Sequence, residues 1–134
     1  HKYISYRLPS IEIAGYRQSK KGLKYLGDLC SDFGGNIKFL IGKKTKHKRT
    51  NSNNLKTNLS NKKNKQSVDG NTNTVYVNPL NSLKLVLNFI KRDKIKLVND
   101  FYVFTGSTVG VVPTAKGLYE GKIDKVGSVK VKIT

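Results

Sequence analysis

Two short stretches near the start of the chain alternate between apolar and polar residues. Ile11 and Ile13 flank the polar Glu12, which predicts a strand because successive side chains of a strand point to opposite faces. Residues 36–41 alternate in the same way and predict a second strand. Between them, apolar residues recur at helical spacing, at Leu23, Leu26, Leu29 or Cys30, and Phe33.

The helix predicted between these strands has recognisable ends. Ser19 suits its N-cap, because a serine side chain accepts a hydrogen bond from the first turn, and Gly34–Gly35 suits its end. Cys30 is the only cysteine of the chain, so no intrachain disulfide can form. We expect Cys30 to be packed as a small buried hydrophobic residue, in a reducing compartment.

The second half of the chain predicts one helix and several strands. Asn78 and Pro79 suit the N-cap and first position of a helix that presents the apolar residues of 80–90 as one stripe. The sequence LKLVLNFIKR also alternates, so an extended segment is the other interpretation of this stretch. Strands are predicted over residues 74–77, 100–104, 109–112 and 128–133.

The two halves are separated by residues 43–73, which are rich in lysine and asparagine. Residues 43–67 hold nine basic side chains and no acidic one, and Leu55 and Leu59 are their only large apolar residues. Such a segment cannot bury enough apolar surface to offset its ordering entropy, so we expect it to be disordered when free. A solvated, asparagine-rich insertion is the alternative, but it does not explain the single sign of charge, which indicates ordering against phosphates.

Together these elements predict an α/β to α+β fold with two small lobes. Residues 1–42 form the N-terminal strand–helix–strand lobe, residues 43–73 the basic insertion and residues 74–134 a mostly β C-terminal lobe. A chain of 134 residues has room for one ordinary domain or for two small lobes that share a core.

The net charge narrows the choice of partner. Lysine and arginine number 26 against 8 acidic residues, which gives a formal charge of +18. Such an excess repels itself in the compact state and favours an anionic partner, most often nucleic acid. No apolar run approaches the roughly 18 residues of a spanning helix, so we expect no membrane partner. The chain begins at His1 and contains no methionine, so we expect its true N-terminus and any targeting segment to be missing.

Groups suited to catalysis or metal binding are scarce in the sequence. His1 and His47 are the only histidines, and the carboxylates show no metal-ligand spacing. Ser107, in TGSTVG, lacks the sequence frame of a nucleophile elbow or of a phosphate loop. We therefore expect no enzyme activity, no metal, no cofactor and no small-molecule substrate.

The most specific binding candidate is the segment PTAKGLYEGK, residues 113–122. A hydroxyl, a mobile cation and a glycine in one loop can contact phosphate, ribose or a base edge, although a plain β-turn would account for the same residues. The exposed face of the last strand and the basic segment add further cations. The candidate RNA-binding residues are Thr114, Ala115, Lys116, Gly117, Lys130, Lys132, Lys43, Lys44, Lys46, Lys48 and Arg49.

The run VGVVPTAKGLYEGKIDKVGSVKVKIT, residues 109–134, resembles the C-terminal motif of small-subunit ribosomal protein eight. In that family a strand leads into a Ser-Thr-Ser-Lys-Gly loop, and a glycine-rich entry leads to a final strand. Thr114 matches the central threonine, Lys116–Gly117 the Lys-Gly pair, and Gly127 the glycine before the closing strand. The strand, helix, strand order of the N-terminal half also looks like that family.

The chain departs from this family in several places. Pro113 and Ala115 replace both serines of the loop, and residues 43–74 look inserted. The resemblance implies a two-lobed α/β protein that binds ribosomal RNA of the small subunit beside neighbouring ribosomal proteins. Because organelle ribosomal proteins diverge this far, we expect the mitochondrial ribosome, with the cytoplasm as alternative. A ribosomal protein of another family and a free-standing RNA- or DNA-binding protein are the competing interpretations.

Overall fold

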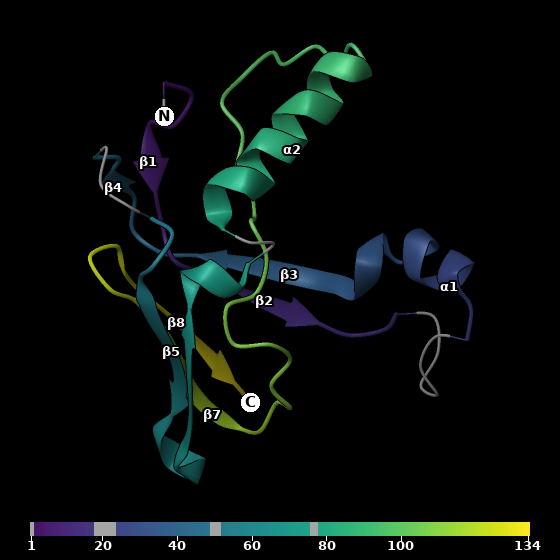
Figure 1. The fold of residues 1–134 in the computed structure, drawn as a ribbon. Coiled ribbons are helices and arrows are strands. Elements are labelled where there is room, and N and C mark those ends of the chain that lie inside the picture. Colours follow the sequence, from purple (N-terminus) through teal and green to yellow (C-terminus); the bar gives the residue numbers. More distant parts are fainter. Residues whose placement is uncertain (1, 18–23, 49–51, 76–77) are drawn as a thin grey trace.

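The fold of the protein is α+β. The computed structural model describes residues 2–17, 24–48, 52–75 and 78–134, and this part contains two α-helices and eight strands in small sheets. Figure 1 shows helix α2 above the sheets and helix α1 at the right of the molecule. The mixture of helices and small sheets confirms the predicted fold class.

The largest sheet has four antiparallel strands in the order β6-β5-β7-β8. The alternation of valine and lysine that predicted the last strand is confirmed, because Val129 is buried while Lys130 and Lys132 are exposed. The strands are β5 Lys56–Asn61, β6 Gln66–Asn71, β7 Gly117–Ile123 and β8 Gly127–Ile133.

Strands β5 and β6 come from the segment that the sequence predicted to be a disordered insertion. In the structure, residues 56–71 are a paired hairpin, and β5 is an inner strand of the sheet, so the prediction is wrong for this stretch. The cause is a polar interior. Thr57 and Asn61 are buried, and the Thr57 hydroxyl donates to the hydroxyl of Thr108 at 2.8 Å. The prediction counted only apolar residues as able to fill a core, but hydrogen-bonded polar side chains can do so.

The N-terminal half contains the two predicted strands, β2 (Ser10–Ala14) and β3 (Asn36–Ile41), which pair antiparallel. Helix α1 (Leu26–Ser31) is shorter than predicted and has Tyr25 at its N-cap, while the predicted cap Ser19 lies outside the described residues. A 3-10 turn follows it. Its glycines have positive φ, as the predicted helix end requires.

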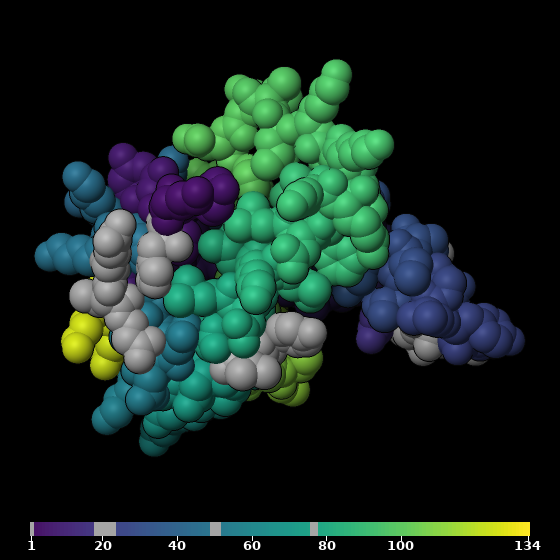
Figure 2. Space-filling view, turned by 45° about the horizontal axis from the view of Figure 1, so that its top comes forward, coloured from purple at the N-terminus to yellow at the C-terminus, as the bar shows by residue number. Residues whose placement is uncertain are grey.

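Helix α1 extends away from the body of the protein, as the space-filling view shows (Figure 2). None of its residues is buried; Leu26, and Phe33 in the 3-10 turn that follows, are strongly exposed, at 75% and 82%. Cys30 is exposed as well, so the prediction that it is a buried packing residue is wrong. Of the apolar stripe that the helical spacing predicted, Leu26, Leu29, Cys30 and Phe33 are exposed, while Leu23 lies outside the described residues.

Helix α2 spans Pro79–Arg92, which confirms the predicted helix and excludes the extended interpretation. The Asn78 side chain accepts a hydrogen bond from the backbone N–H of Asn81 at 2.9 Å and so caps the first turn. A further short ladder joins two strands at the N-terminal end of the protein, β1 (Tyr6–Arg7) and β4 (Thr45–Lys46).

Two predicted strands, over residues 100–104 and 109–112, are not present, and the described part of a third, over residues 74–77, is not a strand. The structure has a 3-10 turn over Thr72–Thr74 and a buried, irregular Val75, and residues 76–77 lie outside the described part. Residues 100–104 and 109–112 are irregular too. An alternating pattern shows that a segment has one apolar and one polar face. To form a strand, the segment also has to pair with the free edge of another strand.

The irregular stretch after α2 instead packs its side chains onto the sheets. The ring of Phe104 stacks on that of Phe39 in β3, with the centroids 3.6 Å apart. A cavity of about 910 Å³ remains between this stretch, α2, β2 and the large sheet.

Candidate nucleic-acid interface

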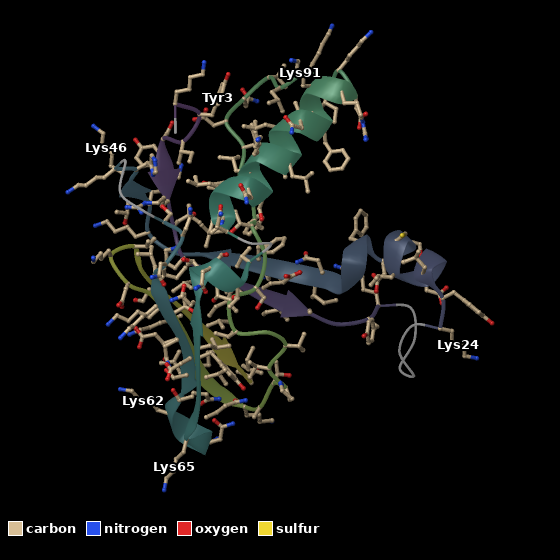
Figure 3. All side chains as sticks on the ribbon, in the orientation of Figure 1. Tyr3, Lys24, Lys46, Lys62, Lys65 and Lys91 are labelled. Atoms are coloured by element: carbon tan, nitrogen blue, oxygen red, sulfur yellow. The ribbon has the colours of Figure 1, made fainter. Side chains whose placement is uncertain are left out.

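A basic groove of about 570 Å³ lies on one face of the large sheet, across β5, β7 and β8. Its lysines come from three separate parts of the chain: the turn between β5 and β6, the loop before β7, and strand β8. Figure 3 shows the turn, with Lys62 and Lys65, at the lower end of the molecule. We call this site the lysine groove, and its five lysines are Lys62, Lys63, Lys116, Lys130 and Lys132.

The register of the sheet places the two lysines of β8. Lys130 stands opposite Glu120, and its Nζ lies 3.6 Å from Glu120 Oε1, while Lys132 stands opposite Leu118. Directly opposite residues of antiparallel strands share one face, so both lysines lie on the same surface. Glu120 is the only acidic side chain among the described residues that line the groove. The lysine groove is therefore strongly positive.

The loop from Pro113 to Lys116 is held by a chain of hydrogen bonds. The backbone N–H of Ala115 donates to the Tyr119 hydroxyl at 2.9 Å, and this hydroxyl donates to Gln66 Oε1 at 3.0 Å. Gln66 Nε2 donates in turn to the carbonyl of Pro113 at 3.4 Å. The amide of Ala115, one of the candidate RNA-binding residues, therefore donates to Tyr119 within the protein, and the exposed Lys116 side chain is the cation that the loop presents.

The structure divides the predicted site residues between two places. Lys116, Gly117, Lys130 and Lys132 lie together in the lysine groove. Thr114 lines the large cavity instead, and Ala115 is half-buried. The predicted lysines at the start of the basic segment lie away from the groove, in and beside β4, where Figure 3 labels Lys46. These residues are Lys43, Lys44, Lys46 and Lys48, while Arg49 lies outside the described residues.

Two groove residues, Lys62 and Lys63, were not among the predicted contacts. They belong to the run KKNK, residues 62–65, which was a visible signal of charge. The chain forms a 3-10 turn there, with Lys65 in the left-handed region at φ 55°, and this turn brings the two lysines beside Lys116. Their place in the groove depends on the pairing of β5 with β7, which the sequence did not reveal.

A second basic region surrounds β4. The Nζ atom of Lys44 lies 5.5 Å from the ring centroid of Tyr6 and 5.4 Å from that of Tyr102. The backbone N–H of His47 donates to the Ser5 carbonyl at 2.9 Å. Burial lowers the pKa of His47, and the positive charge of Arg7 lowers it further. The neutral form of His47 is therefore favoured, and the positive charge of this region comes from its lysines and from Arg7.

The described residues contain no group of three or more histidine, cysteine, aspartate or glutamate side chains that could hold a metal ion. Among the helices of the same residues, none has the length and apolar character needed to cross a membrane. The groups that the lysine groove offers to a ligand are lysine ammonium groups and backbone N–H groups, and both bind phosphate.

Comparison of the chain with protein-family models and with curated proteins found no match. The resemblance to small-subunit ribosomal protein eight therefore stays a prediction from the residues of the loop and of the last strand.

Proposed function

We propose that this protein is a structural constituent of the ribosome that binds ribosomal RNA through the lysine groove. The observation that carries the proposal is the convergence of five lysines from three parts of the chain around a single glutamate. Like charges gathered in one groove repel each other, and this repulsion is relieved when phosphates bind. The lysine side chain suits phosphate because it is a compact point charge with three donors.

RNA is favoured over DNA by two features of the chain. Helix α2 holds more leucine and lysine than arginine, asparagine and glutamine, the side chains that most often read base edges in a DNA major groove: it has two asparagines, one arginine and no glutamine. The loop before β7 also resembles the RNA-binding loop of small-subunit ribosomal protein eight. The same resemblance leads us to propose the small subunit and the mitochondrion, with neighbouring ribosomal proteins as further partners.

Two variants of equal charge test the role of the groove. The first changes its five lysines to glutamine. The second changes five exposed lysines that lie elsewhere: Lys24, Lys38, Lys84, Lys91 and Lys96. Both variants lose five of the 18 net positive charges.

Affinity for an RNA hairpin is then measured at several salt concentrations. Each phosphate contact contributes about 0.7 to 0.9 to the slope of log affinity against log salt. We expect the groove variant to lower this slope by about 3 and the control variant to change it by less than about 1. Equal losses in the two variants would show that binding follows net charge alone.

Sedimentation tests the ribosomal part of the proposal. We expect the tagged protein to sediment with the small ribosomal subunit in a gradient and to be released from it by high salt. Sedimentation with the large subunit would favour a ribosomal protein of another family. Recovery only at the top of the gradient would favour a free-standing nucleic-acid-binding protein.

A further inference from the structure

Three exposed tyrosines gather around lysines where β1 pairs with β4. Tyr6 stands opposite Lys46 in this pair, and Lys44 lies over the rings of both Tyr6 and Tyr102. Tyr3 lines the same cavity mouth as these rings, and Figure 3 shows it at the same end of the molecule as Lys46. We call this surface the tyrosine–lysine patch, and it consists of Tyr3, Tyr6, Tyr102, Lys44 and Lys46.

The rings of the patch remain open to solvent. Tyr3, Tyr6 and Tyr102 are 69%, 54% and 50% exposed, although they come from segments nearly a hundred residues apart in the sequence. A contact between a lysine and an exposed ring contributes only about 0.5 to 1 kcal/mol. The stability of the fold therefore does not explain why three such rings lie together. Exposed aromatic side chains gathered in one place are typical of an interaction surface.

We propose that the tyrosine–lysine patch stacks unpaired nucleobases of a single-stranded RNA segment. Every base has a π face on which a tyrosine ring can stack, and Lys44 and Lys46 lie where they can hold the phosphates between such bases. In a duplex the faces of the bases are covered by their neighbours, so the rings select unpaired nucleotides. The inference rests on the proposed function, because it takes RNA as the partner.

The patch is separate from the lysine groove and adds a different kind of contact. The groove presents cations to phosphate, and no aromatic side chain lines it among the described residues. The patch combines cations with rings, which suits both parts of a nucleotide. The exposed Lys43 continues the positive charge beside β4. An RNA that binds both sites has to be unpaired where it contacts the patch.

Three variants test this assignment. Tyr6→Leu with Tyr102→Leu removes two rings and keeps apolar bulk, whereas Tyr6→Phe with Tyr102→Phe keeps both rings. Tyr16→Leu with Tyr25→Leu is the matched control, because these tyrosines are also exposed, at 56% and 74%, but lie beside α1. The probes are a short single-stranded RNA, the same backbone without bases, and an RNA duplex. Melting temperatures establish that each variant is folded.

We expect the leucine variant to bind the single-stranded RNA about tenfold more weakly than the parent, because stacking of one or two bases is lost. The phenylalanine variant and the control variant should bind as the parent does. Affinity for the abasic strand and for the duplex should be unchanged in all of them. An equal loss on the abasic strand, or no loss on the single-stranded RNA, would overturn the inference.

The outcomes separate this inference from the proposed function. If the groove variant loses RNA affinity while the leucine variant binds every probe as the parent does, only the stacking role is wrong. If the parent binds none of the RNA probes, both are wrong. If the leucine variant loses binding to phosphatidylserine vesicles but not to single-stranded RNA, the patch serves a membrane surface and the inference is overturned.

Discussion

The backbone of Gly117 lies directly against the side-chain amide of Asn61. A Cβ added to Gly117 would lie 2.7 Å from Asn61 Nδ2 and 2.9 Å from its Cγ, and Asn61 is completely buried. Gly117 also has a φ of 146°, a conformation that side chains disfavour. Asn61 cannot move aside, because its Oδ1 accepts the backbone N–H of Lys63 in the turn that forms one wall of the lysine groove.

Gly117→Ala should therefore destabilise the fold itself. We expect a loss of about 2 to 4 kcal/mol in the free energy of unfolding, from the strained backbone together with the overlap at Asn61. Gly27→Ala is the control, because nothing lies within 4 Å of its added Cβ, and it should change stability by less than about 1 kcal/mol. Denaturant unfolding measures both values. A stable Gly117→Ala would show that Asn61 yields and that the groove wall is adaptable.

Lys116→Ala should weaken RNA binding without affecting the fold. The Lys116 side chain is exposed and makes no ion pair among the described residues. The melting temperature of the variant should therefore equal that of the parent. We expect a loss of about 1 kcal/mol or more in binding, as for a charge-assisted hydrogen bond. Lys84→Ala, on the exposed side of α2, should change neither quantity. Parent-like RNA affinity in the Lys116 variant would remove the loop from the interface.

The stability of the protein should fall in acid because of Asp32. The backbone N–H of Arg17 donates to its carboxylate at 3.0 Å, the Arg17 guanidinium binds it at 2.7 Å, and both hold its pKa below the usual 3.8. A lowered pKa in the folded state gives stability that is present above 3.8 and is lost as the pH falls through the folded value.

Asp32→Asn should accordingly be less stable than the parent at neutral pH and approach it in acid. Arg17→Met should keep part of the pH dependence, because the hydrogen bond from the backbone N–H, the largest single cause of the lowered pKa, remains. Unfolding measured across the acidic range tests both expectations. If the free energies of unfolding of the parent and of Asp32→Asn differ by the same amount at every pH, the charge of Asp32 plays no role in the loss of stability in acid.

The cap of helix α2 should contribute measurably to stability. Asn78→Ala removes the acceptor for the Asn81 N–H, and we expect a loss of about 1 kcal/mol in the free energy of unfolding. Asn88→Ala, at an exposed position within the same helix, should have the opposite or no effect, because alanine is the better helix former. Thermal unfolding of the two variants distinguishes a cap effect from a general effect of asparagine loss.

The elements that could be predicted from the amino-acid sequence are those whose signals are local. Asn78–Pro79 and the apolar stripe that follows were enough to predict α2, because capping and helical spacing act within a few residues. The alternation of residues 128–133 predicted β8 and the exposure of Lys130 and Lys132 for the same reason. The net charge and the Lys-Gly loop indicated a phosphate-binding surface, since both are properties of composition and of neighbouring residues.

Which segments pair, and which charged side chains come together, became clear from the three-dimensional structure alone. Residues 56–61 became an inner strand because Thr57 and Asn61 found hydrogen-bond partners inside the protein, and no local pattern shows such partners. Residues 100–104 alternate as a strand does but do not pair as one. The lysine groove joins residues more than fifty positions apart, as does the contact of Lys44 with Tyr102. Such sites depend on strand pairing, which is a competition among distant segments for the same edges.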